Sequence, residues 1–140
     1  MRPMLNPVAL FGTLLFAAWT SPGAQAPSAP TASGSGHVIE VGMKDKGGGQ
    51  WRFEPAAIQA LPGDTVRFIQ TDVVPHNVEF KKTPAGAKLG AAKMGPFLLT
   101  KGDTYDLVID ARFPVGPYAF SCTPHEAMGM KGTLDVGPGT

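Results

Sequence analysis

The chain has 140 residues, of which 43% are hydrophobic and 16% charged, and its formal net charge is +1. This length corresponds to a single domain with its own core, and the near-neutral charge argues against nucleic acid or an anionic membrane surface as a partner. The 18 glycines and 14 prolines favour turns and short strands.

The first 26 residues have the pattern of an export signal. Arg2 supplies a positive charge, residues 8–19 form an apolar run, and residues 24–26 show the small-x-small pattern of a cleavage site. The apolar run is too short to span a bilayer comfortably. The sequence therefore predicts a signal peptide at 1–26, cleavage near Ala26 and a periplasmic protein without stable membrane insertion. An uncleaved anchor helix is the alternative.

Residues 27–36 contain no charge and consist of small residues and proline, which predicts a flexible linker. The domain itself is expected over residues 37–137, as short strands separated by turns. The strands are expected at 37–41, 51–55, 57–60, 65–70, 77–80, 105–109, 118–121 and 131–136.

Two of these segments carry signals of their place in a sheet. Residues 37–41 alternate between apolar and polar side chains, which is typical of an edge strand. Pro55 interrupts the apolar pattern from 51 to 60 and confines it to an edge or a bulge. Residues 83–96 are irregular, with a weak indication of a short helix. Seven or eight short strands with regular turn signals predict an all-β sandwich.

Three side chains that bind metals lie close together near the C-terminus, on the loop expected between the last two strands. They are Cys122, His125 and Met130. Soft sulfur ligands favour Cu(I), imidazole binds copper in both oxidation states, and a weak axial Met is the usual fourth partner of a His₂Cys copper site. His76, at the start of an earlier strand, is the obvious source of the second imidazole. The sequence thus predicts one copper ion.

Cys122 is the only cysteine, so an internal disulfide is excluded. A lone thiol in an oxidising compartment is a liability unless it is buried or ligated, and a metal site resolves that problem. Four protein ligands leave no open position for a substrate, which argues against an enzyme. A catalytic Cys/His pair and a structural zinc site fit the pattern less well, and Met128 is expected to be a loop or surface residue.

The chain resembles the cupredoxins, small blue copper proteins, and among them the pseudoazurin and plastocyanin group. The resemblance covers about residues 37–136 and rests on four segments, namely 53–55, 62–68, 76–79 and 122–130. It implies a cupredoxin-type Greek-key β-sandwich with a type 1 copper ion. It also implies that the ligands are His76, Cys122, His125 and Met130, with Met130 and not Met128 in the axial position.

The resemblance further implies that Asn77 hydrogen-bonds across to the copper-binding loop and that electrons pass through a partly exposed His125. An apolar patch is expected around His125, made by Pro75, Pro96, Pro124, Ala127 and Met128. Five lysines follow nearby in the sequence: Lys81, Lys82, Lys88, Lys93 and Lys101. They form either a solvated face or a surface that steers an acidic redox partner.

These observations favour a monomeric carrier that moves single electrons between larger redox proteins, which dock near His125. Two alternatives stay open. One is a protein for copper delivery or storage, which needs labile ligands. The other is the copper module of a larger redox assembly, attached through residues 21–36.

Overall fold

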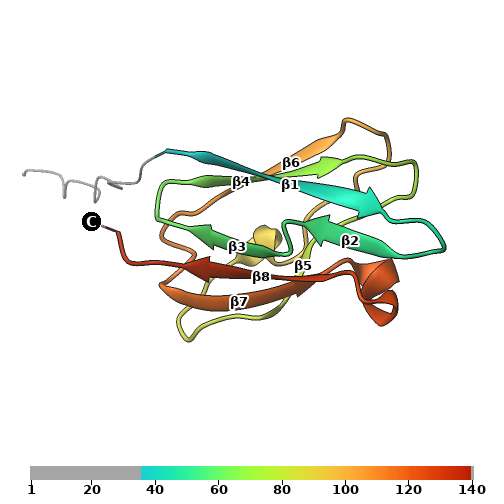
Figure 1. Cartoon of the computed structure of the whole chain (residues 1–140). Helices are drawn as coiled ribbons and strands as arrows, with labels where there is room; N and C mark the ends of the chain where they lie inside the picture. The colour runs from blue at the N-terminus through green and yellow to red at the C-terminus, as the bar shows by residue number, and fades with distance from the viewer. Residues whose placement is uncertain (1–35, 140) are drawn as a thin grey trace, which may run out of the picture.

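Eight strands form two stacked sheets in residues 36–139, the part of the chain that the computed structural model describes (Figure 1). The first sheet contains, in spatial order, β2 (Trp51–Glu54), β1 (Val38–Asp45), β4 (Thr65–Gln70) and β6 (Thr104–Val108). The second contains β3 (Ala57–Ala60), β8 (Lys131–Val136), β7 (Gly116–Ser121) and β5 (Glu79–Lys82). Two short 3-10 helices are η1 (Gly90–Lys93) and η2 (Thr123–Met128).

The all-β sandwich expected from the sequence is confirmed, as are the positions of most strands. The signal peptide predicted at 1–26 lies outside the described residues, as does the predicted linker except for Gly36. Within the described residues, no helix is long and apolar enough to cross a membrane.

The expectation that the first strand lies at a sheet edge is wrong. β1 lies between β2, to which it is antiparallel, and β4, to which it is parallel. The alternation of apolar and polar residues along β1 reflects one buried face, with Val41 and Met43 in the core. It does not show whether other strands pair with β1 on one side or on both. A period of two distinguishes the faces of a strand but not an edge from an interior position.

The expectation for the proline-interrupted segment is confirmed. The chain leaves the first sheet after β2 and enters the second sheet as β3, and both strands are edge strands. Pro55 lies between them, where the missing N–H removes no ladder hydrogen bond. The strand predicted at 77–80 begins later, at Glu79, and His76 forms an isolated bridge with Leu98 before it.

Phe120 is the centre of an aromatic core that joins the two sheets. Its ring meets Phe53 at 4.9 Å, Phe68 at 5.6 Å and Phe80 at 5.8 Å between centroids, each in an edge-to-face arrangement. Such pairs contribute beyond the area they bury. Because Phe120 lies two residues before Cys122, this packing fixes the end of β7 from which the predicted site begins.

The two ends of the sandwich differ. The helix η2 and the turn between β1 and β2 lie at one end, and the start of β1 and the end of β8 lie at the other (Figure 1). All four predicted ligands therefore belong to the end away from the chain termini of the domain.

Replacing Gly132 with Ala tests how tightly the core is packed. A Cβ at this position would lie 2.4 Å from Phe120 Cζ and 3.0 Å from the backbone oxygen of Ala56. We expect Gly132→Ala to lower the free energy of unfolding by about 1–3 kcal/mol, measured by urea unfolding of the copper-free protein. Gly139→Ala is the control, because its nearest neighbour is Pro62 Cγ at 3.6 Å. Equal unfolding midpoints in the two variants would contradict this account of the packing.

Candidate metal centre

Three of the four predicted ligands meet at one buried point. The Nδ1 atoms of His76 and His125 are 3.1 Å apart. Cys122 Sγ lies 3.6 Å from His76 Nδ1 and 3.4 Å from His125 Nδ1. Among the described residues this is the only group of three or more His, Cys, Asp or Glu side chains arranged to hold a metal ion.

The spacing of these atoms fits a bound metal ion. Ligand bonds of about 2.0–2.3 Å at near-tetrahedral angles place neighbouring ligand atoms about 3.3–3.8 Å apart. The observed separations of 3.1 to 3.6 Å are close to that range. Two imidazoles and one thiol form a donor set that suits copper.

The loop that carries Cys122 is closed by its own backbone. The N–H of Cys122 donates to the oxygen of Met130, and the N–H of Met130 donates to the oxygen of His125, both at 3.1 Å. Gly129 ends η2 with a φ of 89°, a left-handed conformation that favours glycine. The chain thus returns directly to β8, with Met130 opposite Cys122.

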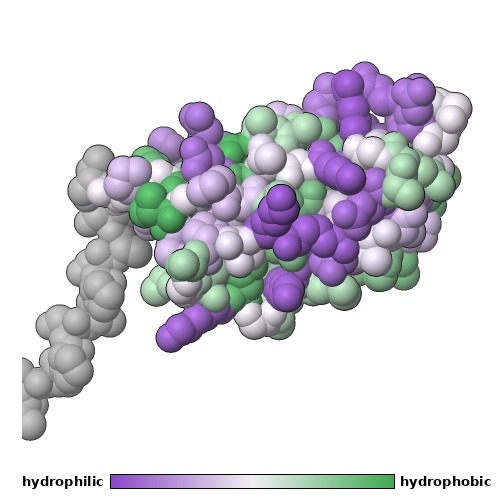
Figure 2. All heavy atoms as spheres, turned by 90° about the horizontal axis from the view of Figure 1, so that it is seen from below, coloured by the Kyte–Doolittle hydropathy of each residue, from purple (hydrophilic) through white to green (hydrophobic). Residues whose placement is uncertain are grey.

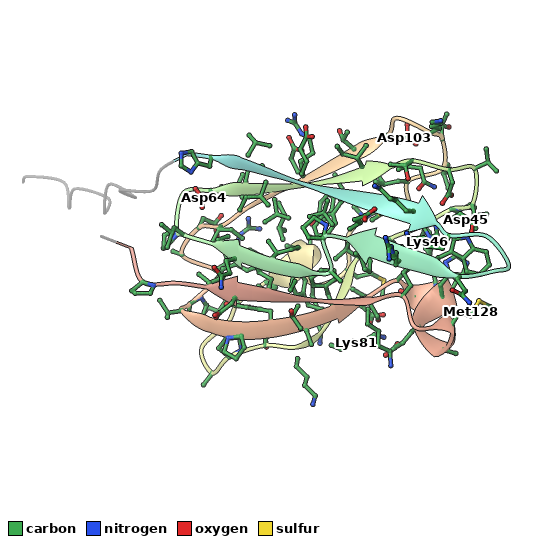
Figure 3. The ribbon with its side chains drawn as sticks, in the orientation of Figure 1. Asp45, Lys46, Asp64, Lys81, Asp103 and Met128 are labelled. Atoms are coloured by element: carbon green, nitrogen blue, oxygen red, sulfur yellow. The ribbon has the colours of Figure 1, made fainter. Side chains whose placement is uncertain are left out.

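Met130 and Met128 differ sharply in burial, as the sequence predicted. Met130 is fully buried among the core residues, whereas Met128 is 55% exposed. Figure 3 shows Met128 on the surface at the same end of the sandwich as Asp45 and Lys46. Of these two methionines, only Met130 is buried beside Cys122.

His76 is fixed by both its backbone and its ring. It exchanges two backbone hydrogen bonds with Leu98, at 3.2 and 2.8 Å. Its Nε2 lies 3.4 Å from the carboxylate of Asp72. A partner at Nε2 favours the tautomer whose Nδ1 is free to bind a metal. Sequence reasoning did not identify Asp72, and its only signal is a position four residues before His76.

Asn77 connects the two chain segments of the site, which confirms the expectation of a bond across to the loop. Its Oδ1 accepts from the N–H of Thr123 at 2.8 Å, and its Nδ2 donates to Thr123 Oγ1 at 3.0 Å. The Thr123 hydroxyl donates in turn to Glu79 at 3.1 Å. Lys81 then bridges Glu79 and Glu126. The loop is therefore tied to β5 by a chain of hydrogen bonds and ion pairs.

Burial sets the protonation of the copper-free site. It raises the pKa of the Cys122 thiol, although the backbone N–H groups of Asn77 and His125 act in the opposite direction. It also lowers the pKa of His125, with a smaller contribution from His76. The site thus contains a neutral imidazole and a protonated thiol, so a metal that binds here releases the thiol proton.

Trp51 is a second residue of the site that sequence reasoning missed. Its indole stacks on the imidazole of His125, with ring centroids 4.1 Å apart and an interplanar angle of 28°. Trp51 is distant from His125 in the sequence and belongs to the other sheet, so no motif links them. His125 is consequently only 7% exposed, less than the partly exposed ligand that was expected.

The residues of the predicted apolar patch lie on the surface. All five members of the patch are exposed: Pro75, Pro96, Pro124, Ala127 and Met128. The five lysines from Lys81 to Lys101 are exposed as well. Figure 2 shows the outer face of the second sheet as a mixture of hydrophilic and hydrophobic side chains, without one continuous apolar area.

Comparison with known proteins gives consistent results. A family model for copper binding proteins of the plastocyanin/azurin family matches residues 39–137. A plastocyanin from Prochlorothrix hollandica is 39% identical over 84 residues, which are 60% of this chain and 62% of that protein. A pseudoazurin from Paracoccus pantotrophus is 38% identical over 109 residues, covering 76% and 68%. The oxidised plastocyanin from Dryopteris crassirhizoma aligns with a TM-score of 0.59 and 32% identity, over 71% of this chain and 100% of that one.

The bonds between Asn77 and Thr123 make a prediction for the copper-free protein. We expect Asn77→Ala to lower the free energy of unfolding by about 1–3 kcal/mol, because it leaves the Thr123 N–H without its acceptor. Thr123→Val keeps that bond and should cost less. Chemical denaturation measures the free energy, and amide exchange at Thr123 reports the local effect. A loss no larger than that of Gln59→Ala, on the exposed face of β3, would contradict the role of Asn77.

Proposed function

The chain belongs to the plastocyanin/azurin family of copper-binding proteins, and we propose that it is an exported blue copper protein that carries single electrons between larger redox proteins. Membership confirms the resemblance to cupredoxins. The observation that carries the proposal is the buried group of His76, Cys122 and His125, whose donor atoms all lie within 4.8 Å of one another.

Copper is the cofactor, and the proposed ligands are His76, Cys122, His125 and Met130. When bound, copper supplies a one-electron couple between Cu(II) and Cu(I). The protein's own groups supply the rest. The imidazoles and the thiolate come from fixed segments, Asp72 orients His76, and Asn77 holds the loop. Groups held in one geometry move little when the charge of the site changes, which favours fast electron transfer.

The same features weigh against the other functions. All three donor residues are buried, which leaves little room for a substrate, so a catalytic role has no support in the site. Copper delivery needs ligands that dissociate easily, whereas the loop here is closed by backbone hydrogen bonds from Cys122 to Met130 and from Met130 to His125. Attachment to a larger assembly through residues 21–36 is the remaining alternative, and stable co-purification with a catalytic subunit would favour it.

The proposed docking surface is the apolar patch around His125, with the lysines of residues 81–101 near it in the sequence. Weak apolar contact permits rapid release, and the lysines would raise the rate of encounter with an acidic partner. The pattern of residues 1–26 supports export, with periplasmic location and a free monomer as parts of the proposal.

Titration with Cu(II) tests the proposal directly. We expect one equivalent to produce an intense blue band that ascorbate bleaches and an oxidant restores. Cys122→Ser should abolish the band, because the thiolate is its source. Met130→Leu should alter the spectrum and the reduction potential, while the matched variant Met128→Leu, at an exposed position, should leave both unchanged. A pale spectrum without reversible bleaching in the wild type would favour delivery or storage.

The second test concerns Pro124, which lies between Cys122 and His125 and has no N–H to donate. Pro124→Ala adds a donor near the thiolate. Because a hydrogen bond to the sulfur weakens its donation to the metal, we expect a higher reduction potential, measured by redox titration of the blue band. Pro117→Ala, at the far end of β7, is the control. An unchanged or lowered potential in Pro124→Ala would contradict the expectation.

A further inference from the structure

The two histidines of the site are oriented by different means. His76 has the carboxylate of Asp72 at its outer nitrogen, Nε2. The imidazole of His125 has no such partner: within the described residues, the only hydrogen-bond contacts of its side chain involve Nδ1, the atom that faces Cys122 and His76. A ligating histidine normally needs a contact on its outer side to fix the plane of the ring. Within the described residues, the other side-chain contacts of His125 are with aromatic rings.

Trp51 provides one of these ring contacts. Its indole lies 4.1 Å from the imidazole of His125 between centroids, nearly parallel to it, and also meets His76 edge-on at 6.4 Å. Trp51 stands opposite Asp45 at the last residue pair of the β1–β2 ladder. The indole is thus anchored on the first sheet, whereas His125 lies on a loop of the second. The indole of Trp51, held by the first sheet, can therefore restrict the movement of the His125 imidazole, which belongs to the second.

The outer side of Trp51 borders a surface hollow of about 620 Å³, whose other lining residues are Lys46, Gln50, Arg52, Met128 and Gly129. Figure 3 places Lys46 and Met128 at this end of the molecule. The indole therefore separates a face of the imidazole from solvent. Its Nε1 is buried and makes no hydrogen bond within the described residues. The ring is held by packing, so a phenyl ring can take its place without losing a hydrogen bond.

We propose that Trp51 is the positioning residue for His125. Its stacking orients the ring of His125, as the contact with Asp72 orients the ring of His76. This inference rests on the proposed function, because it gives His125 the role of a copper ligand. The consequence is a single imidazole plane in both oxidation states. Without the indole, the ring is free to tilt and its face is open to water, so the site changes shape and each electron transfer requires more reorganisation.

The copper-free protein tests the stacking by itself. An indole face shifts the ring protons of a stacked imidazole upfield in the NMR spectrum. We expect this shift at His125 in the wild type and, reduced, in Trp51→Phe, and we expect it to disappear in Trp51→Ala and Trp51→Leu. Trp51→Leu fills more of the space and keeps the test open should the alanine variant fail to fold. A shift that is the same in the leucine variant and the wild type overturns the proposal.

The copper-loaded protein tests the consequence. In self-exchange one electron leaves a reduced copy and enters an oxidised copy, with no bond made or broken. We expect Trp51→Leu to alter the visible and EPR spectra and to slow self-exchange at least tenfold, while Trp51→Phe stays within about threefold of the wild type. Val115→Ala, an exposed position in the loop before β7, is the control. Unchanged spectra and rate in Trp51→Leu overturn the proposal. Absence of a blue band in the wild type, with the upfield shift intact, would instead count against the proposed function.

Discussion

The whole arrangement depends on holding two imidazole nitrogens and one sulfur against each other where water does not reach them. The separations of 3.1 to 3.6 Å leave no space for a solvent molecule between His76, Cys122 and His125. Buried polar groups with poor hydrogen bonding are costly. In the copper-free chain, this cost is offset by contacts outside the group. The fold is therefore best understood as a frame that keeps these three donors together.

The frame draws on both sheets, and each donor is held in its own way. Cys122 follows β7 directly, so the aromatic core around Phe120 sets its position. His76 lies in the connection from β4 to β5 and is fixed by Leu98 and Asp72. His125 lies on the short loop that returns to β8. Its ring is stacked against the indole of Trp51, so packing contributes to its position.

Much of this could be predicted from the sequence, because the information was local. The close spacing of Cys122, His125 and Met130 identifies the loop, and turn residues separate the strands clearly enough to give their number. Other features depend on pairings between distant segments. Alternation along β1 shows which face is buried but not that β2 and β4 flank it. Trp51 meets His125 only because the two sheets close at this end, and no short motif records such a contact.

The burial of the donor group also bears on the function of the bound metal. Opening the loop would expose Met130 and break the hydrogen bond from the N–H of Cys122 to the oxygen of Met130. The link from Thr123 through Glu79 to Lys81 also ties the loop to β5. These contacts do not involve the donor atoms themselves. They therefore hold the loop in place against loss of the metal, and they do not oppose a change in the charge of the metal. A site with that combination is suited to keeping its ion and passing on electrons.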